Sequence, residues 1–150
     1  MKIMVSACLL GDNVKYNGGN NYNQELIDFL QKHEIYKVCP EVMGGLLIPR
    51  IPAEIKDDRV FNEKGKDVTN EYTKGALKVL EIAEKNNIKV AILKERSPSC
   101  GSNEIYDGTF NHQVINGEGI TTKLLKENEI IVLSENNYLE YFKENYYINS

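Results

Sequence analysis

Three cysteines, Cys8, Cys39 and Cys100, are the residues of this sequence best suited to metal or thiol chemistry. They are separated by 31 and 61 residues, which excludes a local Cys-x-x-Cys knuckle. Any site that they share must therefore be assembled by the fold. Because their number is odd, they cannot all pair within one chain, and a reducing compartment disfavours disulfides in any case.

Proline and glycine surround two of these cysteines, in the segments 39–41 (Cys-Pro-Glu) and 97–101 (Ser-Pro-Ser-Cys-Gly). Such residues fix the backbone of a loop, and rigid loops at strand ends are where sites are often built. A free cysteine is also a small apolar side chain that is often simply buried. The proline and glycine residues beside Cys39 and Cys100 therefore favour a functional site over a purely structural role for these cysteines.

Three thiolates could hold two kinds of metal group. Zinc would need a fourth ligand such as a histidine, and neither His33 nor His112 has a motif around it. A [4Fe–4S] cluster usually takes four cysteines, so three would leave one iron open to solvent or substrate. An open position distinguishes a reacting metal from a structural one. The residues alone leave a zinc site, an iron–sulfur cluster and a metal-free thiol as alternatives.

The neighbours of the cysteines would suit a small-molecule site. Glu41 could act as a general base if it is partly desolvated, or it could be an ordinary ion-paired carboxylate. Ser97 could hydrogen-bond a substrate or cap a turn, and Phe110 could stack on a planar ring or lie in a plain turn. Four basic residues near the cysteine loops could bind an anionic or carbonyl group, or could be solvated: Lys15, Arg50, Lys94 and Arg96.

Four apolar runs predict the β-strands that position these residues, at 3–6, 36–38, 90–93 and 130–133. Helical patterns alternate with them, starting near Asn23, Asp67 or Thr69, Gly119 and Ser134. This alternation predicts an α/β fold, a three-layer sandwich with a mostly parallel, Rossmann-like sheet of about four strands. Residues 40–55, which include three prolines, are expected to form a shaped loop.

Each cysteine follows the carboxyl end of one predicted strand. In open α/β sheets, ligands bind in the crevice outside these ends. The fold is therefore expected to bring Cys8, Cys39 and Cys100 from three separate loops to one place.

The length of 150 residues predicts one domain, over residues 1–150, with a core that needs no disulfide staples. The net charge of −4 argues against a general nucleic-acid binder. No apolar run approaches the roughly 18 residues of a membrane span, so no membrane partner is expected. The apolar start of the chain is too short for a signal peptide, which predicts a cytoplasmic protein.

Six short motifs, in a fixed order, carry a resemblance to a known family. They lie at residues 6–11, 38–46, 49–50, 65–69, 94–101 and 106–110. In these motifs the chain resembles the thiouracil desulfidase (TudS-like) family, from about residue 2 to residue 134. The ordered set is specific, whereas any single motif would be weak.

The resemblance implies a [4Fe–4S] cluster with Cys8, Cys39 and Cys100 as ligands and one iron that the protein does not ligate. It implies removal of sulfur from a thiolated uracil compound without net redox change. The motif glutamate falls on Glu41, expected to activate a water, and the motif serine falls on Ser97, expected to orient the ring. Relatives with an additional C-terminal domain act on 4-thiouridine in tRNA. A chain of one domain is expected to act on a thiolated pyrimidine base, nucleoside or nucleotide instead.

Two other functions compete with this one. A metal-free hydrolase would use Cys100 as nucleophile and Glu41 as base, and the absence of a well-placed histidine counts against it. An iron–sulfur or zinc binding module, such as a sensor, would hold the metal without turnover. Iron content distinguishes the metal-free hydrolase from a desulfidase. Turnover of a thiolated substrate distinguishes a desulfidase from the binding module.

Overall fold

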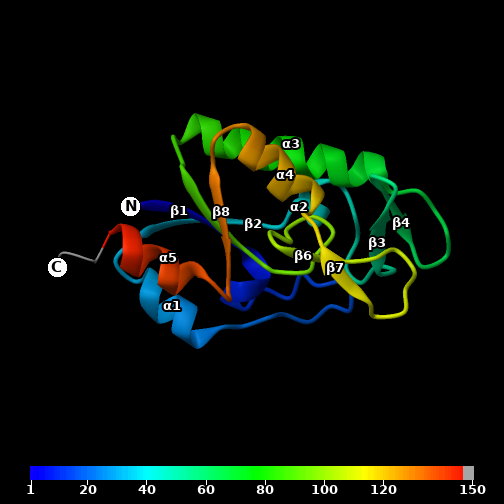
Figure 1. Cartoon of the computed structure of the whole chain (residues 1–150), viewed down its shortest axis with the longest axis horizontal. Helices are drawn as coiled ribbons and strands as arrows, with labels where there is room; N and C mark the ends of the chain where they lie inside the picture. Colours follow the sequence, from blue (N-terminus) through cyan, green and yellow to red (C-terminus); the bar gives the residue numbers. More distant parts are fainter. Residues whose placement is uncertain (147–150) are drawn as a thin grey trace.

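The core of the structure is a four-stranded parallel β-sheet. The computed structural model describes residues 1–146. Its sheet has the order β2-β1-β5-β8, with every strand pair parallel (Figure 1). The strands are β1 (Lys2–Ser6), β2 (Glu34–Val38), β5 (Val90–Leu93) and β8 (Ile131–Ser134). The predicted parallel sheet of about four strands is confirmed.

The two central strands are buried along almost their whole length. All four residues of β5 are buried, and only Lys2 of β1 is exposed. A strand covered on both faces needs a continuous apolar run rather than an alternating one. This requirement explains why the run at residues 90–93 predicts its strand so closely.

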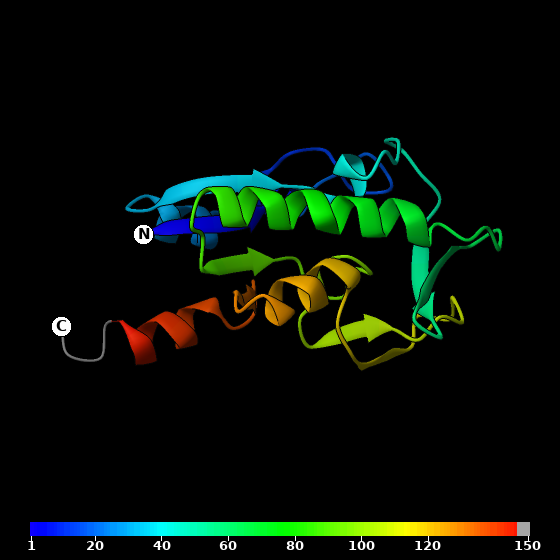
Figure 2. The same ribbon diagram turned by 90° about the horizontal axis from the view of Figure 1, so that it is seen from above.

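Helices form the two outer layers (Figures 1 and 2). They are α1 (Gln24–Leu30), α3 (Thr69–Lys85), α4 (Ile120–Glu127) and α5 (Tyr138–Asn145). Successive residues of β1 pack against opposite layers. Met4 shares a core with α3 and α4, whereas Ile3 and Val5 share one with α1 and α5. The predicted three-layer α/β sandwich is confirmed.

The helix starts predicted near Asp67 and Ser134 have different outcomes. Asp67 Oδ1 accepts a hydrogen bond of 2.9 Å from the Thr69 N–H, at the first residue of α3. Ser134 instead ends β8, and its N–H donates to Asn137, the residue that precedes α5. The last helix therefore begins three residues later than the Ser134 cap predicts.

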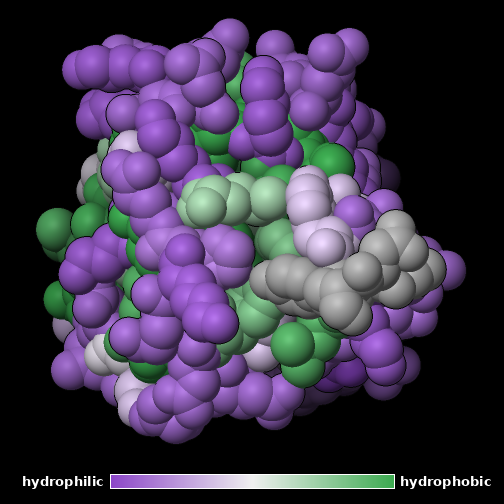
Figure 3. All heavy atoms as spheres, turned by 90° about the vertical axis from the view of Figure 1, so that its left-hand side faces the viewer, coloured by the Kyte–Doolittle hydropathy of each residue, from purple (hydrophilic) through white to green (hydrophobic). Residues whose placement is uncertain are grey.

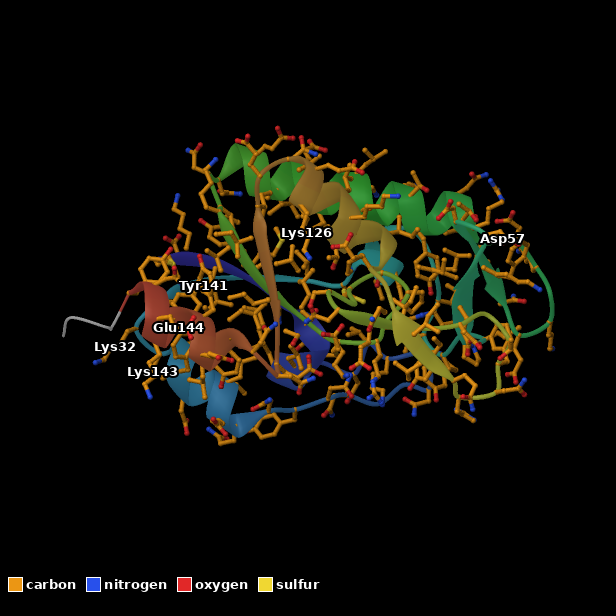
Figure 4. All side chains as sticks on the ribbon, in the orientation of Figure 1. Lys32, Asp57, Lys126, Tyr141, Lys143 and Glu144 are labelled. Atoms are coloured by element: carbon orange, nitrogen blue, oxygen red, sulfur yellow. The ribbon has the colours of Figure 1, made fainter. Side chains whose placement is uncertain are left out.

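Two small antiparallel hairpins lie beyond the carboxyl ends of the parallel sheet (Figure 1). Their strands are β3 (Ala53–Lys56), β4 (Arg59–Asn62), β6 (Glu104–Tyr106) and β7 (Val114–Asn116). Asp57, at the tip of the β3–β4 hairpin, lies at the opposite end of the molecule from Lys143 and Glu144 of α5 (Figure 4). The hairpins thus extend the molecule on the side where the loops that follow the strands of the parallel sheet lie.

The expectation of a shaped loop over residues 40–55 is wrong at both ends. Pro40–Met43 form the short helix α2, and the residues from Ala53 onward belong to β3. A proline at the first position of a helix loses no hydrogen bond, because the N–H there has no partner within the helix. Pro40 therefore starts α2 rather than preventing it.

The end of the molecule that carries the N-terminus and α5 has a mostly hydrophilic surface (Figure 3). Apolar side chains are scattered among the polar ones, as is normal for a protein surface. Within residues 1–146, no helix combines the length and the apolar character that a membrane crossing requires.

Candidate active site

A cavity of about 780 Å³ opens outside the carboxyl ends of the parallel strands. Loops that follow β1, β2 and β5 line it, together with residues of both hairpins. It is also lined by every residue that the sequence singles out: Cys8, Lys15, Cys39, Glu41, Arg50, Lys94, Arg96, Ser97, Cys100 and Phe110. The fold thus brings residues from distant parts of the sequence to one place.

The three cysteines reach this cavity from three strand ends. Cys8 lies in the 3₁₀ helix η1 (Ala7–Leu10), directly after β1, and Cys39 lies between β2 and α2. Cys100 lies in the loop after β5. All three are free thiols, of which Cys100 is buried and the other two are partly exposed.

Burial raises the pKa of all three thiols. The pKa of Cys100 rises to about 12, although hydrogen bonds from Ser99 and Ser6 act in the opposite direction. The hydroxyl oxygens of these serines lie 3.4 and 3.6 Å from the Cys100 sulfur. The charge of a neighbouring Cys8 thiolate adds to the effect of burial. A bound metal would lower the pKa of these thiols instead, because a coordinating thiol is deprotonated.

Glu41, in the first turn of α2, is held from two sides. Its Oε2 accepts a hydrogen bond of 2.9 Å from Arg50 Nε and forms an ion pair with the same guanidinium. The two side chains are only 12% and 9% exposed. Its Oε1 faces the hydroxyls of Ser97 and Ser99, at 3.4 and 3.3 Å. The carboxylate thus has one oxygen committed to Arg50 and one directed at hydroxyl groups.

Tyr72 of α3 also contacts Glu41. Its side chain is buried, and its hydroxyl lies near the Glu41 carboxylate. Burial and the nearby carboxylate both raise the pKa of this phenol well above its usual value. The phenol therefore keeps its proton and can donate it in a hydrogen bond at neutral pH.

The structure confirms a turn-capping role for Ser97, whereas a hydrogen bond from Ser97 to a substrate stays a prediction. Its Oγ accepts hydrogen bonds from the N–H groups of Ser99 and Cys100, at 3.1 and 3.2 Å, so it caps the turn. The same hydroxyl lies next to Glu41 Oε1 and 2.9 Å from the Ser99 hydroxyl. A side chain in this position links the geometry of the Cys100 loop to the carboxylate.

The four basic residues at the cavity differ in their partners. Arg50 donates to the carbonyl of Val14 as well as to Glu41. Lys94 forms an ion pair of 2.8 Å with Glu135. Arg96 is half-exposed with the Glu104 carboxylate 3.8 Å away, and Lys15 lines the cavity. Lys15 and Arg96 are therefore better placed to meet an anionic group than Arg50 and Lys94.

Phe110 lines the same cavity from the loop between β6 and β7. Its backbone has a φ of 59°, in the left-handed region. Glu54 Oε1, from β3, accepts hydrogen bonds from the N–H groups of Gly108 and Phe110, at 3.0 and 3.1 Å. One carboxylate thus ties this loop to the other hairpin and fixes the placement of Phe110.

Comparison with known families agrees with the sequence motifs. The model of the 2-thiouracil desulfurase family matches residues 3–137. The chain belongs to the 2-thiouracil desulfurase family. The family that the motifs predict is therefore confirmed.

Two relatives cover nearly the whole chain. The solved structure of a [4Fe–4S]-dependent thiouracil desulfidase, TudS, is similar with a TM-score of 0.88 and 44% identity, over 93% of each chain. An uncharacterized protein of Bacillus subtilis (strain 168), YbbK, is 40% identical over 144 residues, covering 89% of this chain and 95% of that protein. The first of these similarities supports the α/β fold described above.

In this member of the 2-thiouracil desulfurase family, the thiols could hold a cluster more readily than a single ion. Within residues 1–146, no three His, Cys, Asp or Glu side chains are grouped closely enough to hold one metal ion. A cluster provides a separate iron for each thiolate, so its ligands stand further apart. Of the two histidines, His112 lines the cavity, whereas His33 packs against Phe29. Three soft sulfur donors around one cavity suit an iron–sulfur group.

Three polar residues at the cavity were not expected to contribute to the site. Ser99 lies between Ser97 and Cys100, and this position is a signal that sequence reasoning could have used. Tyr72 occupies an apolar position of α3, so its hydroxyl gave no signal. Glu95 is a buried carboxylate directly before the Cys100 loop, and burial of a charged side chain cannot be read from one sequence.

Proposed function

We propose that this chain is a [4Fe–4S]-dependent desulfidase that acts on a thiolated uracil compound. Water replaces the sulfur, so the products are the uracil form and hydrogen sulfide, with no net change in oxidation state. The observation that carries the proposal is the meeting of three free cysteines with the Glu41–Ser97 pair in one cavity. Membership of the 2-thiouracil desulfurase family supports the choice of substrate.

Cys8, Cys39 and Cys100 are the proposed ligands of the cluster. They are soft donors, and they come from three separate loops at neighbouring strand ends. Three ligands leave one iron without a protein ligand. When bound, the cluster supplies a Lewis-acidic iron that accepts the substrate sulfur and polarises the carbon–sulfur bond.

Glu41 is the proposed general base. Arg50 holds Oε2, so Oε1 remains to accept a proton from the water that attacks the ring carbon. The Ser97 hydroxyl, next to Oε1, is placed to orient the ring and the water. The Tyr72 hydroxyl, which keeps its proton at neutral pH, lies near the same carboxylate.

The proposed substrate is a small thiolated pyrimidine. Phe110 offers an aromatic face for the ring from the hairpin side, and Lys15 and Arg96 offer positive charge for a phosphate group. Arg50 and Lys94 contribute through their ion pairs with carboxylates. A tRNA substrate is less favoured, because the net charge of −4 repels a polyanion.

The decisive experiment measures sulfide release after anaerobic reconstitution with iron and sulfide. The substrates are 4-thiouracil, 4-thiouridine and its monophosphate, which separate base, nucleoside and nucleotide. Cys100→Ala is expected to abolish both iron binding and turnover. Val132→Ala, at a buried residue of β8 outside the cavity, controls for damage to the core. Full activity of Cys100→Ala with an intact cluster would contradict the proposed ligand set.

The competing functions give different results in the same experiment. Sulfide release by protein without iron would indicate a metal-free cysteine hydrolase. Stable iron binding without turnover of any thiolated pyrimidine would indicate a binding or sensor module. The proposed function requires that iron content and turnover rise together.

A further inference from the structure

The loop over residues 96–103, between β5 and β6, carries Ser97, Ser99 and Cys100 of the candidate site. It contains no helix or strand, and regular structure joins its ends only through an isolated β-bridge between Arg96 and Ile105. Arg96, near its start, has a φ of 69°, a conformation that a side chain of this size rarely adopts. Something other than local preference must hold the loop in this shape.

Glu95, the residue before this loop, reaches back into it with a buried side chain. Its Oε1 accepts hydrogen bonds from the N–H groups of Ser102, Asn103 and Glu104, at 2.8, 3.0 and 3.1 Å. The N–H of Arg96 adds a longer bond of 3.3 Å. One carboxylate oxygen therefore accepts hydrogen bonds from Arg96, at the start of the loop, and from residues 102–104, where the loop leads into β6.

The second carboxylate oxygen accepts hydrogen bonds from two side chains at the end of the same loop. Oε2 accepts hydrogen bonds from Ser102 Oγ and Asn103 Nδ2, at 3.3 and 3.2 Å. Burial alone would raise the pKa of Glu95, but the backbone N–H groups outweigh it and the pKa lies below its usual value. The carboxylate thus stays charged in a buried position where backbone N–H groups stabilise it.

A different element holds the middle of the loop. The N–H groups of Ile120 and Thr121 in α4 donate to the carbonyls of Pro98 and Ser99, each at 2.9 Å, and Thr122 Oγ donates to the Cys100 carbonyl at 2.8 Å. Glu95 therefore closes the two ends of the loop, whereas α4 supports its centre. Cys100 is buried between these two attachments.

We propose that Glu95 is the positioning residue for Cys100. Its carboxylate closes the loop over residues 96–103 before any cofactor arrives, so that the Cys100 sulfur is presented to the cavity in a fixed place. This role rests on the proposed function, because it takes Cys100 to be a cluster ligand. Its first test nevertheless needs no cluster.

The test measures alkylation of each cysteine in the cofactor-free protein under anaerobic conditions, by peptide mass spectrometry. Glu95→Gln retains the size of the side chain but turns one acceptor into a donor that faces other donors. Cys100 is expected to react about 10-fold faster in this variant, because a loosened loop opens more often. The rates at Cys8 and Cys39 are expected to stay within about 2-fold of the wild type.

Glu54→Gln is the matched control. Glu54 also accepts two backbone N–H groups of a cavity loop, but that loop carries no cysteine. The control is expected to leave all three alkylation rates unchanged. Asn103→Ala, which removes one donor to Oε2 and leaves the bonds to Oε1, is expected to give a smaller increase at Cys100 alone. It also keeps the proposal testable if Glu95→Gln does not fold.

Two results would overturn the proposal. One is an unchanged Cys100 rate in both variants, and the other is an equal rise at all three cysteines, which would indicate general destabilisation. A second readout follows loss of iron from reconstituted protein to a chelator, which is expected to be faster in Glu95→Gln than in Glu54→Gln. If the wild type takes up no iron, the proposed function fails, whereas the alkylation result still decides the role of Glu95.

Discussion

The cavity has two walls, which are stabilised in different ways. The sheet wall consists of the loops that follow β1, β2 and β5, and the hairpin wall consists of residues from the β3–β4 and β6–β7 hairpins. On the sheet wall, the cysteine loops continue directly from strands such as β1 and β5, which are buried on both faces. On the hairpin wall, the strands have three or four residues and are mostly half-exposed. A two-stranded hairpin is only marginally stable by itself.

The hairpin wall depends instead on a few specific contacts. Glu54 ties the Phe110 loop to β3 through two backbone hydrogen bonds. A small apolar cluster around Val60, Val68 and Tyr72 joins β4 to the start of α3. Loss of one such contact is expected to affect this wall and leave the sheet wall intact.

The difference suggests a division of labour. A cluster needs ligands that keep one geometry, and the sheet wall provides two of them, Cys8 and Cys100, from loops that follow buried strands. A substrate has to enter and leave, and the hairpin wall offers an aromatic side chain on a less deeply anchored loop. Variants of the sheet wall should therefore change the chemical step or the cofactor. Variants of the hairpin wall should change substrate affinity.

Glu41→Gln tests the sheet wall with the largest expected effect on rate. Removal of a general base is expected to lower kcat by about 10²- to 10⁴-fold, because the water then loses its proton acceptor. Iron content should remain that of the wild type, since no cysteine is altered. Steady-state kinetics of sulfide release measures kcat, and iron and labile sulfide analysis measures the cluster.

Glu63→Gln controls for the loss of a carboxylate at the same cavity. Glu63 also lines the cavity, but it is exposed and lies on the hairpin side after β4. It is expected to retain wild-type kcat. A Glu41→Gln enzyme with undiminished kcat would assign the base to another group.

Arg50→Met tests whether Arg50 acts through Glu41 or on the substrate. The variant leaves a nearly buried carboxylate without its partner, so the free energy of unfolding of the cofactor-free protein is expected to fall by about 3 kcal/mol. If Arg50 acts through Glu41, kcat falls for base, nucleoside and monophosphate alike. A rise in KM confined to the monophosphate would instead show that Arg50 binds phosphate.

Arg59→Met provides the comparison for the stability measurement. Arg59 pairs with Asp67 at the surface, where both side chains are well exposed. Exposed pairs contribute little to stability. Denaturant unfolding should therefore show a much smaller loss in Arg59→Met than in Arg50→Met.

Phe110→Ala tests the hairpin wall. Loss of a stacking surface for the pyrimidine is expected to raise KM by about 10-fold, while kcat and iron content change little. Phe110→Tyr keeps the ring and is expected to retain the KM of the wild type. Equal KM values for Phe110→Ala and the wild type would show that the ring does not contact substrate.

The sequence predicts the sheet wall better than the hairpin wall, for a physical reason. Burial on both faces forces a continuous apolar run, so residues 90–93 reveal their strand locally. Ala53–Lys56 has no buried residue, so this strand lacks the continuous apolar run that marks a strand buried on both faces. The rule that ligands gather at strand ends then places Cys8, Cys39 and Cys100 together.

The roles of the polar side chains were harder to predict, because their partners lie far apart in the sequence. Arg50 contacts Glu41 across a loop of irregular structure, and no spacing rule relates the two. Glu95 is next to a strand end, but only the folded loop shows that it receives four N–H groups. Residue type predicts that a group is charged, whereas tertiary structure decides what it binds.

Asp67→Asn tests the hairpin wall with the smallest expected effect. Hydrogen bonds from Arg59 and Thr69 lower the pKa of Asp67 from 3.8 to about 2. A lowered pKa stabilises the fold above the pKa of the unfolded chain, and this contribution is lost as the pH falls from about 4 to about 2. The variant is expected to have a Tm about 1–2 °C below that of the wild type at pH 7. The difference should shrink as the pH approaches 2.

Asp57→Asn, at the tip of the same hairpin, is the control for this small effect. Asp57 has a φ of 53°, a conformation that asparagine also tolerates, so the Tm of Asp57→Asn is expected to stay close to that of the wild type. Thermal unfolding of the cofactor-free proteins at pH 2, 4 and 7 provides the measurement. A Tm difference for Asp67→Asn that persists at pH 2 would mean that the side chain stabilises the hairpin without its charge. Faster alkylation of Cys100 in the same variant would mean that the two walls are not independent.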